Sequence, residues 1–124
     1  MTSFTLDISK FAADCGEKAD QAVRKACLQL LVGVVMKTPV DTGRARGNWQ
    51  ASVNSPSTVA TEDTDKIGAG TIAAGNAAVD GATGNVFWLS NNLPYIERLE
   101  YGHSKQSPQG MVRLTINEVR ASLS

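Results

Sequence analysis

The side chains best suited to catalysis in this 124-residue chain gather near its C-terminal end. The single histidine, His103, is adjacent to Ser104 and follows Glu97 and Glu100 closely. A histidine can activate a neighbouring hydroxyl, and a pair of carboxylates can divide the acid and base roles. However, Glu97 and Glu100 are three residues apart beside Arg98, which is the spacing of an exposed ion-pair face of a helix. We therefore expect no catalytic residues, and we keep a small cytosolic hydrolase or nuclease that uses His103 and Glu100 as the alternative.

The two cysteines are expected to be buried thiols rather than ligands or nucleophiles. Cys15 and Cys27 fall in one expected helix, where twelve residues correspond to about 18 Å along the axis. A disulfide tolerates only about 7 Å between Cα atoms, so the two cannot pair with each other. A structural zinc site needs several ligands at fixed spacing, and one histidine with two cysteines on one helix does not supply them.

Two loop sequences resemble ligand-binding loops without completing them. Asp63-Thr64-Asp65 resembles the opening of a calcium loop, but the third oxygen position, the glycine and the final glutamate are missing. The glycines at 68, 70 and 75 do not have the spacing of a dinucleotide fingerprint, and no apolar strand precedes them. We therefore expect no metal ion and no cofactor.

Length and charge place the chain among small single-domain proteins, with one domain spanning residues 1–124. Twelve basic and twelve acidic side chains cancel, and no helix-turn-helix pattern is present, so sequence-specific nucleic-acid binding is not expected. The most apolar run, residues 27–36, is far shorter than the roughly 20 residues that cross a bilayer. Without a signal-peptide pattern, the expected place of synthesis is a cytoplasm, with no membrane partner.

The elements follow from the spacing of apolar residues. The expected helices cover residues 11–36, 71–79, 95–101 and 111–123, and the expected strands cover residues 49–53 and 86–89. Together they predict an α+β fold, in which a long N-terminal helix packs on a small antiparallel sheet and shorter helices include a C-terminal one.

Details of this packing can also be predicted. The stripe on the long helix should bury Val23, Cys27, Leu30 and Val34 against a sheet that holds Trp49 and Trp88. Pro39 should end this helix, and Asp41 or Thr42 should cap a short helical turn. In the helix over residues 71–79, the inward side chains should be Ile72, Ala73 and Val79. The polar loops 55–70 and 103–109 are expected to be mobile in an isolated subunit and ordered on assembly.

Two segments resemble one known family when they are taken together. Residues 39–49 read Pro-Val-Asp-Thr-Gly-Arg-Ala-Arg-Gly-Asn-Trp, and residues 91–104 read Asn-Asn-Leu-Pro-Tyr-Ile-Glu-Arg-Leu-Glu-Tyr-Gly-His-Ser, before a Pro-Gln-Gly-Met-Val-Arg run at 108–113. This pattern is similar to that of phage minor tail, neck and tail-completion proteins, in the order of elements, the spacing and the chain length. Ala45 departs from the pattern, because an aliphatic residue is more usual there.

The resemblance implies a structural virion protein that acts at the head–tail junction. Such a protein assembles as a ring of copies of itself, where six copies would match the symmetry of the tail, and contacts other neck, connector or tail-tube proteins. Both segments carry polar and aromatic side chains suited to recognition, so contacts between subunits are expected there. The expected interface residues are Asp41, Arg44, Arg46, Tyr95, Glu97, Glu100 and Tyr101.

Overall fold

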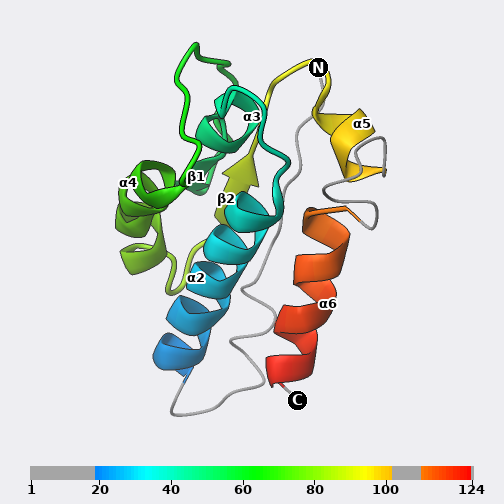
Figure 1. The fold of residues 1–124 in the computed structure, drawn as a ribbon. Helices are drawn as coiled ribbons and strands as arrows, with labels where there is room; N and C mark the ends of the chain where they lie inside the picture. Colours follow the sequence, from blue (N-terminus) through cyan, green and yellow to red (C-terminus); the bar gives the residue numbers. More distant parts are fainter. Residues whose placement is uncertain (1–18, 102–109, 124) are drawn as a thin grey trace.

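A computed structural model describes residues 19–101 and 110–123 of the chain. In chain order, its elements are α2 (Ala19–Lys37), α3 (Arg44–Gly47), β1 (Gln50–Val53), α4 (Ala69–Asp80), β2 (Phe87–Ser90), α5 (Ile96–Glu100) and α6 (Val112–Leu123). The chain therefore has the predicted α+β fold (Figure 1). The predicted start of the long helix, with Cys15, lies outside the described residues, as does the loop 103–109.

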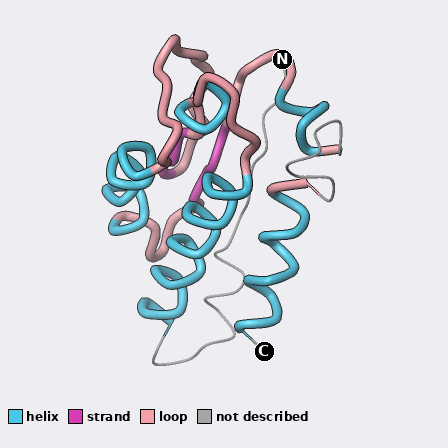
Figure 2. Tube along the Cα trace, in the orientation of Figure 1, coloured by secondary structure: helices cyan, strands magenta, loops and turns pink. Residues whose placement is uncertain are grey.

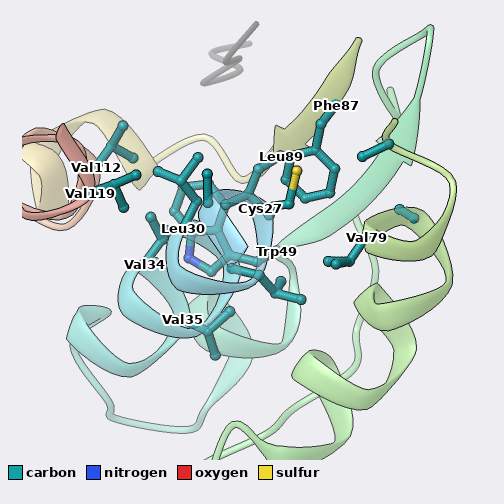
Figure 3. Packing of buried hydrophobic residues seen from close by; sticks show 14 of the residues in the cluster. Cys27, Leu30, Val34, Val35, Trp49, Val79, Phe87, Leu89, Val112 and Val119 are labelled. Atoms are coloured by element: carbon teal, nitrogen blue, oxygen red, sulfur yellow. The ribbon is translucent and has the colours of Figure 1, made fainter. Parts of the chain in front are cut away.

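Helix α2 is the centre of the molecule, with α4 on one side of it and α6 on the other (Figure 1). Its predicted stripe is confirmed, because Val23, Cys27, Leu30 and Val34 are all buried. Figure 3 shows several of these side chains packed together with residues of the sheet. Burying a large aliphatic side chain contributes about 1.5–3 kcal/mol, so this stripe supplies much of the stability of the fold.

The sheet consists of β1 and β2, paired antiparallel with Gln50 opposite Ser90 and Val53 opposite Phe87. In β2, Phe87 and Leu89 point into the core and are buried. Trp88, between them, points to the other face of the sheet and is only half-buried. The sheet therefore holds Trp88, as predicted, but on the face opposite the core. Strand alternation places its two neighbours, Phe87 and Leu89, in the core instead.

Trp49 lies in the core, as predicted, although it immediately precedes β1. Its Nε1 donates to Thr38 Oγ1 at 2.7 Å, and the Thr38 hydroxyl donates in turn to the carbonyl oxygen of Val34 at 2.7 Å. Helix α2 ends at Lys37, ahead of Pro39 as expected. The tryptophan is thus tied to the end of the central helix by hydrogen bonds as well as by packing.

Helix α4 is longer than predicted and is turned differently. Val79 is buried as expected, but Ile72 is half-buried and Ala73 is exposed, so the prediction for Ala73 is wrong. The reason is the close approach of α4 to α2, because a Cβ on Gly75 would lie 2.6 Å from Leu31 Cδ2. Gly75 must therefore face α2, which turns Ala73 towards solvent. No helix among residues 19–101 and 110–123 is long and apolar enough to cross a membrane.

Candidate assembly site at the two motif segments

The connection between β1 and α4, residues 54–68, is here called the strap; Figure 2 shows it as a long loop beside α3. Side chains from the first motif segment hold it. Arg44 Nε donates to the Thr61 carbonyl at 3.1 Å, and the Asn48 side-chain amide donates to the same oxygen at 3.1 Å. Asn48 also accepts from the Thr61 N–H at 2.7 Å. Asn48 is fully buried, so these bonds fix the middle of the strap rather than a solvated surface.

Gly43 sits where the end of the strap touches the first motif. Its φ of 89° is in the left-handed region, and its carbonyl accepts from the Asp65 N–H at 2.9 Å. A Cβ at this position would lie 2.7 Å from the backbone nitrogen of Lys66. Only glycine meets both requirements. Thr42 Oγ1 accepts from the Arg44 N–H at 3.2 Å, as predicted, although the N-cap residue of the short helix α3 is Gly43.

Arg46 joins three chain segments within the subunit. Its Nη1 donates to the Lys66 carbonyl at 2.7 Å, and its Nη2 donates to the carbonyls of Met36 and Thr38 at 3.0 and 3.1 Å. Its guanidinium therefore binds the end of α2 to the end of the strap, which is a role within the subunit that the sequence did not predict; its part in a subunit interface stays a prediction. Arg44 keeps a partly exposed side chain and pairs with Glu62 at 3.2 Å.

The start of the second motif segment contacts the first motif segment and the strap. Asn91 donates to the Ala45 carbonyl at 2.9 Å, and Asn92 donates to the carbonyls of Ser57 and Val59 at 2.9 and 3.1 Å. Sequence reasoning quoted both asparagines in the motif without giving them a role. Consecutive asparagines directly after a buried strand are a signal for side chains that bind backbone groups.

Glu100 is fully buried and caps α6. Its Oε1 accepts from the N–H groups of Met111 and Val112 at 2.8 Å each, and its Oε2 accepts from the Arg113 N–H at 3.0 Å. Helix α6 has no Ser, Thr, Asp or Asn immediately before it, so a distant carboxylate satisfies its first amides and complements its dipole.

The predictions for Glu100 are therefore wrong, because its side chain is neither on an exposed ion-pair face nor accessible to another subunit. Both of its oxygens accept hydrogen bonds from the start of α6, so the described residues give Glu100 a capping role. His103, the other residue of that alternative, lies outside the described residues.

The surroundings of Glu100 complete this cap. Arg113 Nε donates to Glu100 Oε2 at 3.0 Å, and the Tyr101 ring lies 4.8 Å from the Arg113 guanidinium carbon. Gly110 has a φ of 87°, and a Cβ there would lie 2.5 Å from the Glu100 carbonyl oxygen. The Leu-Glu-Tyr motif and the Gly-Met-Val-Arg run thus form one structural unit.

Asp65 caps α4 in a similar way, so the resemblance of residues 63–65 to a calcium loop has another explanation. Its Oδ1 accepts from the Gly68 N–H, and its Oδ2 accepts from both the N–H and the hydroxyl of Thr71, all at 2.8 Å. These bonds, chiefly the one from the Thr71 N–H, lower the pKa of the Asp65 carboxyl below its ordinary value of 3.8. No group of three potential metal ligands occurs in the part of the chain that the structure describes.

A cavity of about 600 Å³ lies between the strap, the start of β1 and α4, and is lined by Trp49, Thr61, Asp65 and Gly75 among others. Asp65 uses its oxygens for capping, and Trp49 and Thr61 use their polar groups for the bonds given above. Trp49, Thr61 and Asp65 therefore have structural roles in the wall of this cavity.

The remaining predicted interface residues are accessible. Asp41 and Glu97 are exposed, and the side chains of Tyr95 and Tyr101 are 37% and 59% exposed. Figure 1 shows α3 and α5, the helices of the two motifs, at the same end of the molecule. The structure therefore brings the two segments together and leaves four of the seven predicted side chains on the surface there, with Arg44 partly exposed.

Comparisons with protein-family models, with curated proteins and with solved structures give no match for this chain.

Proposed function

We propose that this protein is a structural component of a tailed-phage virion, which acts at the head–tail junction as a neck or tail-completion protein by assembling into a ring. Its partners are further copies of itself, six in the ring, and the neck, connector or tail-tube proteins above and below. The proposal rests first on the resemblance of residues 39–49 and 91–113 to that family.

One structural observation carries the proposal further. The motif side chains Arg44, Arg46 and Asn92 hold the strap in place, and the strap exposes Val59 and Ile67, whose side chains are 55% and 76% accessible. A braced loop with exposed apolar side chains is suited to contact another protein, because little conformational entropy is lost on binding.

Charge and surface chemistry agree with a role in assembly. The formal net charge is 0, so copies of the chain do not repel one another strongly. The exposed tyrosines at 95 and 101 are of the residue type that is enriched at protein interfaces.

The proposal can be tested by electron microscopy of particles made with and without this protein. We expect separate heads and tails when the protein is missing, and joined particles when the wild-type chain is supplied in trans. Joined, infectious particles in its absence would contradict a role at the junction. A protein that is absent from purified wild-type particles would contradict the virion assignment altogether.

A further inference from the structure

Resting on the ring assembly proposed above, we propose that Ile67 of one subunit inserts into the groove between α2 and α6 of the next copy. The contact joins two different surfaces of the same chain. The structure supplies both surfaces, and each is exposed in the single subunit.

The inserting side chain is presented rigidly. Ile67 is 76% exposed, and the residues on both sides of it are fixed, because Arg46 binds the Lys66 carbonyl and Asp65 binds the Gly68 N–H. Gly68 has a φ of 90°, which turns the chain sharply at this point. An apolar side chain held on a fixed corner is preorganised to serve as an anchor, since its backbone has little freedom left to lose.

A second apolar side chain accompanies Ile67. Met36, at the end of α2, is 48% exposed, and its sulfur would lie 3.0 Å from a Cβ placed on Gly68. Met36 thus lies against Gly68, the residue that follows Ile67, and adds an exposed apolar side chain near the turn that carries Ile67.

The receiving groove has a volume of about 390 Å³ and apolar walls formed by Leu28 and Val32 of α2 and Val119 of α6. Leu28, at its edge, is 41% exposed. A cavity of about 150 Å³ already holds a molecule of the size of benzene, so the groove has room for an isoleucine side chain. Close contact of the two helices defines its base, since a Cβ on Gly33 would lie 2.5 Å from Thr115 Cγ2.

The positions of the two surfaces favour a ring over a two-fold dimer. Figure 1 shows α4, which Ile67 precedes by two residues, and α6 on opposite sides of α2. A contact between two such separated patches is heterologous, and its repetition forms a ring when the rotation between neighbours closes and an open filament when it does not.

The charges at the two surfaces favour a second copy as the occupant. Lys66, next to Ile67, is exposed and forms no ion pair with the described residues. Glu118 lines the groove with a 56% exposed side chain, and its Oε2 accepts from Lys37 Nζ at 3.2 Å. Its Oε1 accepts no hydrogen bond within residues 19–101 and 110–123, so it can accept one from Lys66 of the neighbouring subunit.

The test is disulfide cross-linking with two separate variants, Ile67→Cys and Val32→Cys, each carrying Cys15→Ser. Each variant is purified alone, the two are mixed, and they are also co-expressed during particle assembly. We expect a cross-linked dimer under mild oxidation in the mixture and in the particles, and none with either variant alone. Ala77→Cys, on the exposed side of α4 and outside the proposed contact, replaces Ile67→Cys in the control and should not cross-link to Val32→Cys.

The outcomes separate this contact from the proposed function. If the protein is present in particles and the mixed variants do not cross-link there, the contact is wrong while the ring proposal stands. If the purified chains cross-link but the protein is absent from particles, the contact stands and the virion assignment fails. As an independent measurement, Ile67→Asp should weaken self-association at least about tenfold in native mass spectrometry, whereas Ala77→Asp, an exposed position of α4, should not. Equal association of both variants would contradict the contact, and unchanged urea unfolding of the Ile67→Asp subunit would exclude misfolding as the cause of a loss.

Discussion

Glu100 and Arg113 are joined twice: Arg113 Nε donates to the Glu100 carboxylate at 3.0 Å, and Arg113 Nη2 donates to the Glu100 main-chain carbonyl at 2.6 Å. The same carboxylate accepts the first amides of α6, so one buried side chain holds both ends of the segment between α5 and α6. The Leu-Glu-Tyr motif that suggested a subunit contact is thus explained first by the internal architecture of the subunit.

Replacing Glu100 should destabilise the subunit strongly. Glu100→Ala leaves the buried amides of Met111 and Val112, and the part-buried amide of Arg113, without their acceptor, and each buried loss costs about 1–3 kcal/mol. Glu100→Gln keeps one oxygen and should be intermediate. Urea unfolding followed by circular dichroism measures these effects. Glu97→Ala, in the same helix but exposed, should change the free energy of unfolding by less than about 0.5 kcal/mol. Equal effects of Glu100→Ala and Glu97→Ala would refute the capping role.

Substitutions of Arg46 and Arg44 should change the free energy of unfolding by different amounts. Arg46→Lys cannot reproduce three carbonyl contacts with one ammonium group, so we expect a loss of about 1–3 kcal/mol in the free energy of unfolding. Arg44→Lys affects a partly exposed side chain whose ion pair with Glu62 is worth at most about 1 kcal/mol. If Arg46→Lys and Arg44→Lys unfold at the same urea concentration, the three contacts of Arg46 are not needed for stability.

The contribution of Asp65 to the stability of the fold should decrease as the pH falls. Its pKa is lowered in the folded protein by the hydrogen bonds from Thr71 and Gly68, so its stabilising effect is present in full above the ordinary pKa of 3.8. The effect is then lost as the pH falls below 3.8 and through the lowered pKa. The difference in stability between wild type and Asp65→Asn should accordingly shrink between pH 5 and pH 3 in urea titrations. Asp63→Asn serves as the control. A stability difference between wild type and Asp65→Asn that does not change with pH would contradict the capping role of the Asp65 carboxylate.

Cys27 should be inert in the folded protein. Burial raises the pKa of its thiol from 9.0 to about 12, which makes the reactive thiolate about a thousandfold rarer in the folded state. We expect labelling by a maleimide at pH 8 only after unfolding, with peptide mapping by mass spectrometry to separate Cys27 from Cys15. The neutral buried thiol stabilises the fold below pH 9, and this contribution declines as the pH rises towards 12. Rapid native labelling of Cys27 would show that α2 opens readily.

Two hydrogen bonds of the structure bear on the predicted mobility of the strap. Its expected mobility in the isolated subunit is untested, yet the Thr61 and Asp65 amides donate to Asn48 and to the Gly43 carbonyl at 2.7 and 2.9 Å. The sequence showed a polar loop, and polar composition alone does not reveal that distant side chains bind its backbone.

The fold could be predicted to the extent that it depends on local periodicity. The stripe of α2, the two short strands and the closing helix repeat apolar residues at spacings that follow from backbone geometry. The face of α4 could not be predicted, because Ala73 and Gly75 are both small and only packing against Leu31 decides between them. The roles of Glu100 and Arg46 were also hidden, since their partners lie thirteen and twenty residues away at Arg113 and Lys66.

The most direct measurement of the central claim is electron microscopy of particles produced without this protein, compared with particles complemented by the wild-type chain. Complementation with Asp80→Asn, a change at the exposed end of α4 and outside the predicted interface, controls for expression of a folded variant. The account predicts that heads and tails accumulate separately without the protein and join again with either complementing chain. Normal joined and infectious particles in its absence would contradict it.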